Sequence, residues 1–274
     1  PRIVVKQAQQ RGGIGGNWNA CMKHGNAPLV QYLFQDDIWD STYLQKSVEA
    51  LTSDETLALT AANHFYRDDQ GQDIGGRYGE IKALRDGMFR GKGDGKKFLM
   101  DWIAQGLAPN LIGEPSFVLM RRTCMEQAGP FVEDMPQFLD VEYWTRMLLT
   151  GGWYGIRENL GTFRVHPDGA SARNERSGQG MFDRFRCFQK LISTLPRGPE
   201  RKAVIGARNQ SLEEMIDKFF NRVKGGKKVT GGGGKKTRAL QWSDYPILLG
   251  GVVRYILRTP WRMSEHKKPA KQPS

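Results

Sequence analysis

Two adjacent carboxylates, Asp36 and Asp37, follow directly after the apolar run 29–34 (LVQYLF). Such a run predicts a strand, and open α/β sheets bind their ligands beyond the carboxyl ends of strands. Carboxylate oxygens suit Mg²⁺ or Mn²⁺, which usually keep water and combine one or two acidic ligands with phosphate oxygens. A pair of acids is equally typical of a solvated turn whose carboxylates cap a helix. The pair therefore needs support from the rest of the chain.

The segment 11–17 (RGGIGGN) is the second feature that bears on chemistry. Its glycine content is too high for a regular helix or strand, so it predicts a loop. It does not match a P-loop, because the Gly-Lys-Ser/Thr ending is missing, and its spacing differs from the dinucleotide fingerprint. Asn17 and Asn19 either fix this loop or cap the helix expected over 18–24.

Four motifs occur in the order and at the separations of one enzyme family. They are 12–19 (GGIGGNWN) with 27–39 (APLVQYLFQDDIW) and Tyr43-Leu44, then 113–122 (GEPSFVLMRR), 139–146 (LDVEYWTR) and 163–167 (FRVHP). Together they resemble the family-2 glycosyltransferases, inverting enzymes of the A-type fold that use nucleotide-sugar donors. The resemblance covers residues 1–175. It implies an α/β fold with a mostly parallel, open sheet between flanking helices, and a role in polysaccharide or cell wall biosynthesis.

The resemblance implies the catalytic and metal-binding residues. Asp37, helped by Asp36, would hold Mg²⁺ or Mn²⁺ against the diphosphate, which stabilises the charge of the leaving group. Asp140 would remove the proton of the acceptor hydroxyl. Glu142 is the rival base, but two positions apart on a helix the side chains point about 200° apart. A salt bridge or a solvated surface position is the alternative for Glu142.

Further site residues follow from the same resemblance. His166 would ligate the metal or touch the diphosphate, and a structural, hydrogen-bonded histidine is its alternative. The residues expected to bind the donor are Gly12, Gly13, Asn17, Asn19, Asp36 and Arg164. Glu114 and Trp144 are expected on the acceptor side. Trp144 and Trp18 also fit an ordinary place in the core. The acceptor would be the hydroxyl of a glycan or a lipid-linked sugar.

The match also implies that the first elements of the family's fold are missing at the N-terminus. Residues 2–6 (RIVVK) predict a short buried strand that corresponds to the family's third element. The preceding strand, helix and strand, which hold the base and ribose of the nucleotide, would then be missing. The chain would be either a fragment or a remnant without its donor pocket. The second alternative predicts a non-catalytic protein that binds partners or membranes.

Alternating strands and helices are expected along the chain. Strands are expected at 2–6, 29–34, 56–62, 115–120, 153–156 and 160–165, and helices at 18–24, 41–51, 98–105, 123–128, 140–150, 181–194, 199–223 and 242–258. Residues 67–97 are polar and glycine-rich and predict a long surface loop. The domain organisation expected is a catalytic domain over 1–176, a helical extension over 177–224, a Gly/Lys linker over 225–236, and an amphipathic helix with a basic tail over 237–274.

The net charge of +12 is concentrated after residue 212. Nucleic-acid binding is disfavoured, because the cations do not follow a recognition element with interleaved aromatic residues. Attraction to an anionic membrane surface and plain solubility are the two alternatives for this basic region. The three cysteines are scattered without metal spacing, which is typical of reduced thiols in the cytoplasm.

The last helix expected, 242–258 (WSDYPILLGGVVRYILR), combines an apolar centre with aromatic and cationic flanks. It is shorter than the ~18 apolar residues of a spanning helix and is interrupted by glycines. One prediction is a helix lying in the membrane interface. The other is a helix that packs its apolar side on the catalytic domain. The expected location is cytoplasmic, at the cytoplasmic face of the membrane if this helix binds lipid.

Overall fold

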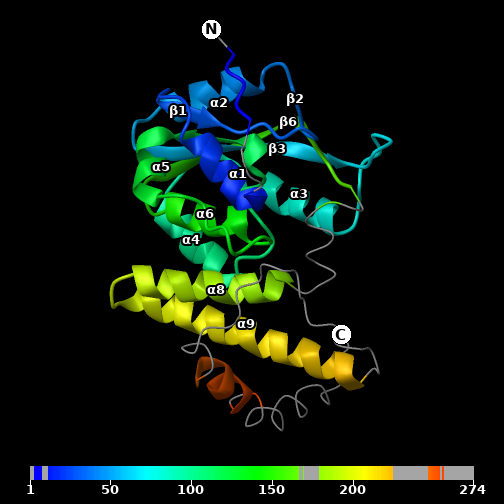
Figure 1. The fold of residues 1–274 in the computed structure, drawn as a ribbon, viewed down its shortest axis with the longest axis vertical. Coiled ribbons are helices and arrows are strands. Elements are labelled where there is room, and N and C mark those ends of the chain that lie inside the picture. The colour runs from blue at the N-terminus through cyan, green and yellow to red at the C-terminus, as the bar shows by residue number, and fades with distance from the viewer. Residues whose placement is uncertain are drawn as a thin grey trace, which may run out of the picture.

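The structure is a computed structural model that describes residues 3–7, 12–166, 169, 179–224, 246–253 and 255. Its centre is a sheet with helices on both faces (Figure 1). The strands are β1 (Leu29–Gln31), β2 (Ile38–Trp39), β3 (Leu57–Arg67), β4 (Gly91–Gly93), β5 (Val118–Arg121) and β6 (Gly152–Arg164). Their order is β1-β5-β3-β6-β2, and β4 pairs with β6 beside this path. The α/β class expected from the sequence is confirmed.

The sheet is mixed, and the expectation of a mostly parallel sheet is wrong. Among the described strands, β3 and β6 pair in parallel, whereas β5 runs antiparallel to both β1 and β3. Strands β2 and β4 also run antiparallel to β6. The reason lies between β3 and β5. Strand β4 carries the chain towards the amino ends of β3 and β6, and the following helix returns it, so β5 enters from their carboxyl ends.

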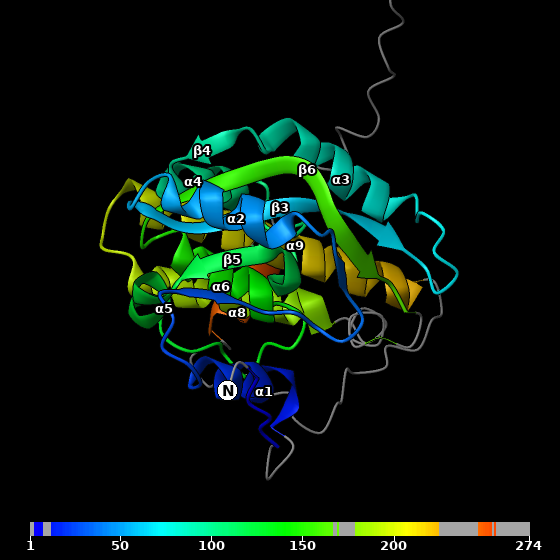
Figure 2. The same ribbon diagram turned by 90° about the horizontal axis from the view of Figure 1, so that it is seen from above.

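The helices form layers above and below this sheet (Figures 1 and 2). They are α1 (Gly13–Met22), α2 (Tyr43–Thr52), α3 (Arg77–Met88), α4 (Gly95–Ala104), η1 (Pro115–Phe117), α5 (Arg122–Ala128), α6 (Leu139–Met147), α8 (Gln179–Thr194) and α9 (Pro199–Lys224). Helix α2 packs on one face through Tyr43 and Ala50, with Ile156 and Leu160 of β6. Helices α4 and α6 cover the other face.

Helices α8 and α9 share the main core with the α/β part. Phe188 and Leu191 of α8 and Val204 of α9 belong to the same buried cluster as Trp102 of α4 and Trp144 of α6. This packing explains why the predicted helices 181–194 and 199–223 form as expected. Residues 246–253 form a further helix against α8 and α9. The predicted linker 225–236 lies outside the described residues.

The glycine-rich segment is helical from Gly13, so the loop prediction for 11–17 is wrong at residues 13–17. Close packing explains the glycines. A Cβ on Gly15 would stand 3.0 Å from the Cα of Glu133 and 3.2 Å from Leu139. Glycine therefore lets α1 approach the loop before α6, at the cost of helix propensity.

Two further expectations fail for identifiable reasons. The long loop predicted at 67–97 contains α3 and β4. Helix α3 escaped the sequence pattern because the residue it buries most deeply is Arg85, at 1% exposure. The strand predicted at 2–6 is absent from the described residues 3–7, and Ile3 is 81% exposed. The two strands predicted at 153–156 and 160–165 form the single long strand β6.

Candidate functional site

The Asp36–Asp37 pair lies on a segment that crosses one end of the sheet. Strands β1 and β2 occupy opposite edges, so residues 32–37 must pass over the end where β1 finishes. Ser116, fully buried in η1, anchors this crossing. Its hydroxyl accepts a hydrogen bond from the Phe34 amide at 3.1 Å, and its carbonyl accepts one from Trp39 Nε1 at 2.7 Å. The acids are therefore held beyond the carboxyl ends of β1, β3 and β6.

Asp37 is buried, with 9% of its surface exposed. Burial is the main reason why the pKa of its carboxyl is raised to about 7. A hydrogen bond with Ser116 lowers the pKa, and the negative charge of Glu114 raises it. Its Oδ2 has no hydrogen-bond partner among the described residues. Arg164, at the end of β6, donates from Nε to the carbonyl of Asp36 and ties the turn to the sheet. One oxygen of this buried carboxylate thus has no hydrogen bond to compensate for the loss of water.

Glu114 lies just before η1, within a buried polar network. Its Oε2 accepts a hydrogen bond from His64 Nε2 at 2.8 Å, and Tyr66 donates to Oε1 at 3.3 Å. Burial alone raises the pKa of Glu114, but His64 and Arg85 outweigh burial and hold it below its usual value. Burial, and then the Arg85 cation, lower the pKa of His64. The network therefore presents an ionised Glu114 held by a neutral histidine.

Arg85 fixes the loop that carries Glu114. Its Nη2 donates to the carbonyls of Ala62 on β3, at 3.0 Å, and Ile112, at 3.1 Å. Gly113 has a φ of +111°, and a Cβ there would stand 2.6 Å from Arg85 Nη2. Glycine is required at this position by both its backbone angle and the arginine against it.

Asp140 begins the first turn of α6. Its Oδ2 accepts a hydrogen bond from Asn110 Nδ2 at 2.8 Å, and its Oδ1 accepts one from the Val141 amide at 2.8 Å. Burial raises the pKa of Asp140 to about 7, and the charge of Glu114 raises it further. No basic side chain pairs with Asp140 in the part of the chain that the structure describes. Its charge is therefore uncompensated.

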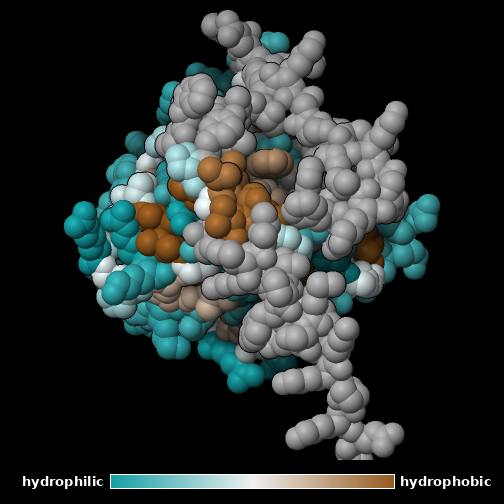
Figure 3. Space-filling model, turned by 90° about the horizontal axis from the view of Figure 1, so that it is seen from below, coloured by the Kyte–Doolittle hydropathy of each residue, from teal (hydrophilic) through white to brown (hydrophobic). Residues whose placement is uncertain are grey.

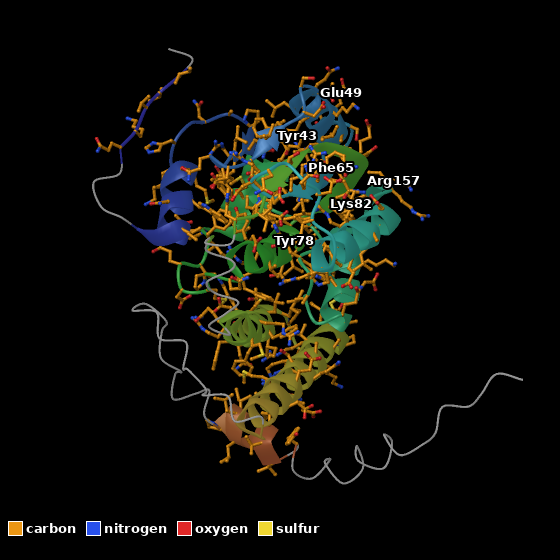
Figure 4. All side chains as sticks on the ribbon, turned by 90° about the vertical axis from the view of Figure 1, so that its right-hand side faces the viewer. Tyr43, Glu49, Phe65, Tyr78, Lys82 and Arg157 are labelled. Atoms are coloured by element: carbon orange, nitrogen blue, oxygen red, sulfur yellow. The ribbon has the colours of Figure 1, made fainter. Side chains whose placement is uncertain are left out.

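Asp37, Glu114 and Asp140 thus come from three different segments to one region. The loop that carries Glu114 links the other two acids, because Asn110 hydrogen-bonds both Gly113 and Asp140, and Ser116 anchors the segment of Asp37. The charge of Glu114 raises the pKa of both aspartates. Aromatic rings lie beside Glu114. Tyr66 donates a hydrogen bond to Glu114, and its ring centroid is 4.8 Å from that of Tyr78, at the start of α3. Figure 4 labels Tyr78 and Lys82, which both belong to α3. The arrangement can bind a cation and accept a proton.

His166 and Trp144 differ in how they relate to this region. His166 Nδ1 lies 2.5 Å from Asp69, its Nε2 is 3.9 Å from an Asp36 oxygen, and that Nε2 has no hydrogen-bond partner among the described residues. Trp144 is completely buried and donates from Nε1 to the carbonyl of Gly113 at 2.8 Å. It supports the loop that carries Glu114, and it has no surface to offer an acceptor.

Glu142 points away from the acids, towards α8. Its oxygens lie 2.7 Å from Arg146 Nη2 and 2.8 Å from Lys190 Nζ. The carboxylate is 1% exposed, so this ion pair is part of the packing between α6 and α8. The salt bridge that the sequence left open for Glu142 is the geometry observed.

The residues expected to bind the donor through the glycine segment lie on α1, and no hydrogen bond or ion pair described joins them to the acids. Gly12, Gly13 and Asn17 are exposed. Asn19 donates to the carbonyl of Phe131 at 2.9 Å and accepts from the Phe131 amide at 2.8 Å. Asn19 therefore fastens α1 to the loop before α6, and its position is explained by structure alone.

The residues that sequence reasoning missed are mostly those that hold the acids. They are His64, Tyr66, Arg85, Asn110 and Ser116. Only Ser116 lies inside a motif that the sequence singled out, at 113–122. The Asn110-x-x-Gly113-Glu114 spacing carries a local signal, because an asparagine side chain bonding its own loop is a common turn device. His64 and Arg85 meet only through tertiary packing.

The fit of a divalent cation rests on donor chemistry. Asp37 Oδ2 and His166 Nε2 are buried lone-pair atoms without hydrogen-bond partners among the described residues. No group of three or more His, Cys, Asp or Glu side chains in the described ranges is arranged to hold a metal by itself. Mg²⁺ or Mn²⁺ bound through one or two protein oxygens, with water and phosphate as the other ligands, agrees with both observations.

A separate pocket of about 840 Å³ lies at the opposite end of the sheet, by the start of α4 and β6. Its cations are already engaged. Arg121 donates to the carbonyl of Leu57 at 2.8 Å, Lys92 pairs with Asp54, and Lys96 pairs with Glu200. These cations hold neighbouring segments of the chain, and the pocket contains none of the three motif acids, so we place the candidate site at the acids.

Comparison with known proteins adds one distant relative. A protein of Mycobacterium tuberculosis (strain CDC 1551 / Oshkosh), the uncharacterized protein MT1568, is 26% identical over 186 residues. The matched region covers 67% of this chain and 57% of the relative, so the chain spans little more than half of that protein's length. No family model matches the sequence. In the described residues, no helix has the length and apolar character needed to cross a bilayer.

Proposed function

We propose that the chain is the catalytic part of an inverting glycosyltransferase, which moves a sugar from a nucleoside diphosphate to the hydroxyl of a glycan or lipid-linked acceptor. One observation carries the proposal: Asp37, Glu114 and Asp140 meet at the end of the sheet where β1, β3 and β6 finish. These acids come from the motifs that resemble family-2 glycosyltransferases. Their meeting supports a shared site, because burying uncompensated carboxylates is costly and persists mainly where function requires it.

The donor would be held at the crossing segment. Asp37, helped by Asp36, would hold Mg²⁺ or Mn²⁺, and His166 would contact the cation or the diphosphate. The cation when bound would stabilise the negative charge of the departing nucleoside diphosphate. Arg164 keeps the Asp36–Asp37 turn against β6, so these oxygens are oriented before the donor arrives. Preorganisation of this kind avoids reorganisation during the reaction.

Asp140 would be the base. As the bond between the sugar carbon and the diphosphate oxygen breaks, the acceptor oxygen bonds that carbon from the opposite face, and its proton passes to Asp140. A single displacement inverts the configuration. Asp140 is suited to this task because its pKa of about 7 lies near physiological pH. Asn110 holds the carboxylate in place, and Glu114 keeps its basicity high through charge repulsion.

A direct test is a screen of uridine, guanosine and thymidine diphosphate sugars for release of the nucleoside diphosphate, with and without Mn²⁺. We expect Mn²⁺-dependent release from one donor class, which Asp37→Ala abolishes while Asp101→Ala, a change at an exposed acid on α4, leaves it intact. Calorimetric titration of the nucleoside diphosphates gives an independent readout of binding. If no nucleotide binds more tightly with Mn²⁺ than without it, the proposal is wrong.

A further inference from the structure

The helix at 246–253 is fixed on α8 and α9 by its apolar side. The docked side chains are Ile247, Leu248, Val252 and Tyr255, and they pack with Met215, Phe185, Leu212 and Ile216. Gly251 allows the close approach, because a Cβ there would stand 2.2 Å from Leu212 Cδ2. The helix is therefore held in one orientation. Of the two predictions for 242–258, these side chains follow the second, in which the helix packs its apolar side on the protein.

A second side of the same helix remains outside this packing. Leu249 is 67% exposed and Val253 is 48% exposed. Residues four apart lie on one face of a helix, so both point in the same direction. Figure 3 shows apolar side chains gathered on the surface at this end of the molecule. We call the surface formed by Leu249 and Val253 the C-terminal face.

The sequence around the C-terminal face is strongly basic. Its cations are Arg238, Arg254, Arg258, Arg262, Lys267, Lys268 and Lys271, against the acids Asp244 and Glu265. Trp242, Tyr245 and Trp261 flank the helix as well. Exposed apolar side chains in a stretch of sequence rich in aromatic residues and cations match an anionic bilayer, where aliphatic groups enter the acyl boundary and cations meet the head groups. Nucleic acid would use the cations but leave Leu249 and Val253 exposed to water.

We propose that the C-terminal face docks the protein on the surface of an anionic lipid bilayer. The helix does not cross the bilayer, because its docked side stays on α8 and α9. This inference is independent of the proposed reaction, since it involves none of the acids at the end of the sheet. In this proposal, Leu249 and Val253 make the apolar contact with the bilayer. The arginines and lysines of the neighbouring sequence provide the long-range electrostatic attraction.

The test is co-sedimentation of the full chain with vesicles of phosphatidylcholine alone or mixed with phosphatidylglycerol. We expect binding that rises with phosphatidylglycerol and falls at high salt, because screening weakens attraction to the surface. Leu249→Asp combined with Val253→Asp should weaken binding about ten-fold or more, since two apolar side chains leave the acyl boundary and two anions are added. Val48→Asp, at an exposed apolar position of α2, is the matched control and should bind normally.

Two results overturn the proposal. One is equal binding of the wild type and the double variant to the mixed vesicles. The other is a wild type that ignores vesicles at low salt but forms a dimer in sedimentation velocity that the double variant abolishes, which assigns the face to a second copy. Thermal unfolding checks that the variants fold. If the double variant does not fold, Leu249→Ser at the most exposed position takes its place.

Discussion

The two sides of α6 carry acids in different surroundings: Glu142 is buried, whereas Asp140 is partly exposed. Asp140 faces the carboxyl ends of the strands, where its hydrogen-bond donors, Asn110 and the Val141 amide, are neutral. Glu142, two residues later, faces α8 and lies between Arg146 and Lys190. The charge of Glu142 is compensated within the structure, whereas that of Asp140 is available to an incoming proton or ligand. The partners of the two acids therefore distinguish them, although both lie at the start of one helix.

The largest expected effect is on turnover, where substitution of Asp140 should differ sharply from substitution of Glu142. With the donor found in the screen, Asp140→Asn should lower turnover by about 10²–10⁴-fold, because the base is lost. The affinity for the donor should hardly change, since Asp140 acts on the acceptor. Glu142→Gln, the matched change on the other side of α6, should keep turnover near that of the wild type. Steady-state rates decide, and a greater loss in Glu142→Gln would falsify the assignment of the base.

The next effect concerns the metal. Asp37→Ala should weaken Mn²⁺-dependent binding of the nucleoside diphosphate by about 10–100-fold or more, because changes even behind metal ligands reach this size. Calorimetry measures it, and the metal-independent part of binding should persist. Glu142→Gln again serves as the buried control that is not expected to touch the metal. Unchanged Mn²⁺ dependence in Asp37→Ala would remove Asp37 from the site.

Glu142→Gln should have a larger effect than Asp140→Asn when stability is measured instead of turnover. Glu142→Gln should lower the free energy of unfolding by about 1.5–3 kcal/mol, because charged hydrogen bonds to Arg146 and Lys190 are lost. Asp140→Asn should be neutral or stabilising, since a partly buried, uncompensated charge is removed. Urea unfolding of both variants tests this contrast. A more stable Glu142→Gln protein would mean that the ion pair does not hold α8 to α6.

Sequence patterns anticipated the acids better than their surroundings. Asp37 stood out because it follows an apolar strand, whereas Glu114 and Asp140 were singled out only because their motifs resemble those of family-2 glycosyltransferases. The residues that hold them come from separate elements: His64 from β3, Arg85 from α3 and Asn110 from the loop before η1. Such meetings depend on tertiary packing and leave no periodic signal in the sequence.

The errors in the predicted fold also arise because tertiary packing leaves no periodic signal in the sequence. Helices whose buried side is apolar, such as α6 and α8, follow the expected spacing and were found. Helix α3 was missed because its deepest residue is the charged Arg85. The first part of α1, before the predicted helix 18–24, was missed because its glycines serve close packing against Glu133. The direction of β5 depends on the path through β4 and α4, which local patterns do not encode.

The last expected effect is the dependence of stability on pH. The folded-state pKa of both Asp37 and Asp140 is about 7, above the ordinary value of 3.8. The folded protein therefore holds these protons more tightly than the unfolded chain, so the two acids favour folding at low pH. Their contribution is lost as the pH rises from about 4 to about 7 and stays constant above that range. Each group changes the stability by at most about 1.4 kcal/mol per pH unit.

Comparison of unfolding curves across this range isolates the effect. Other groups titrate in the same interval, so the quantity to measure is the difference between the wild type and Asp37→Asn or Asp140→Asn. Each variant should lose stability less steeply as the pH rises, because one acid no longer ionises in a buried place. If Asp140→Asn showed the same slope as the wild type, the raised pKa of Asp140 would not contribute to stability over this range.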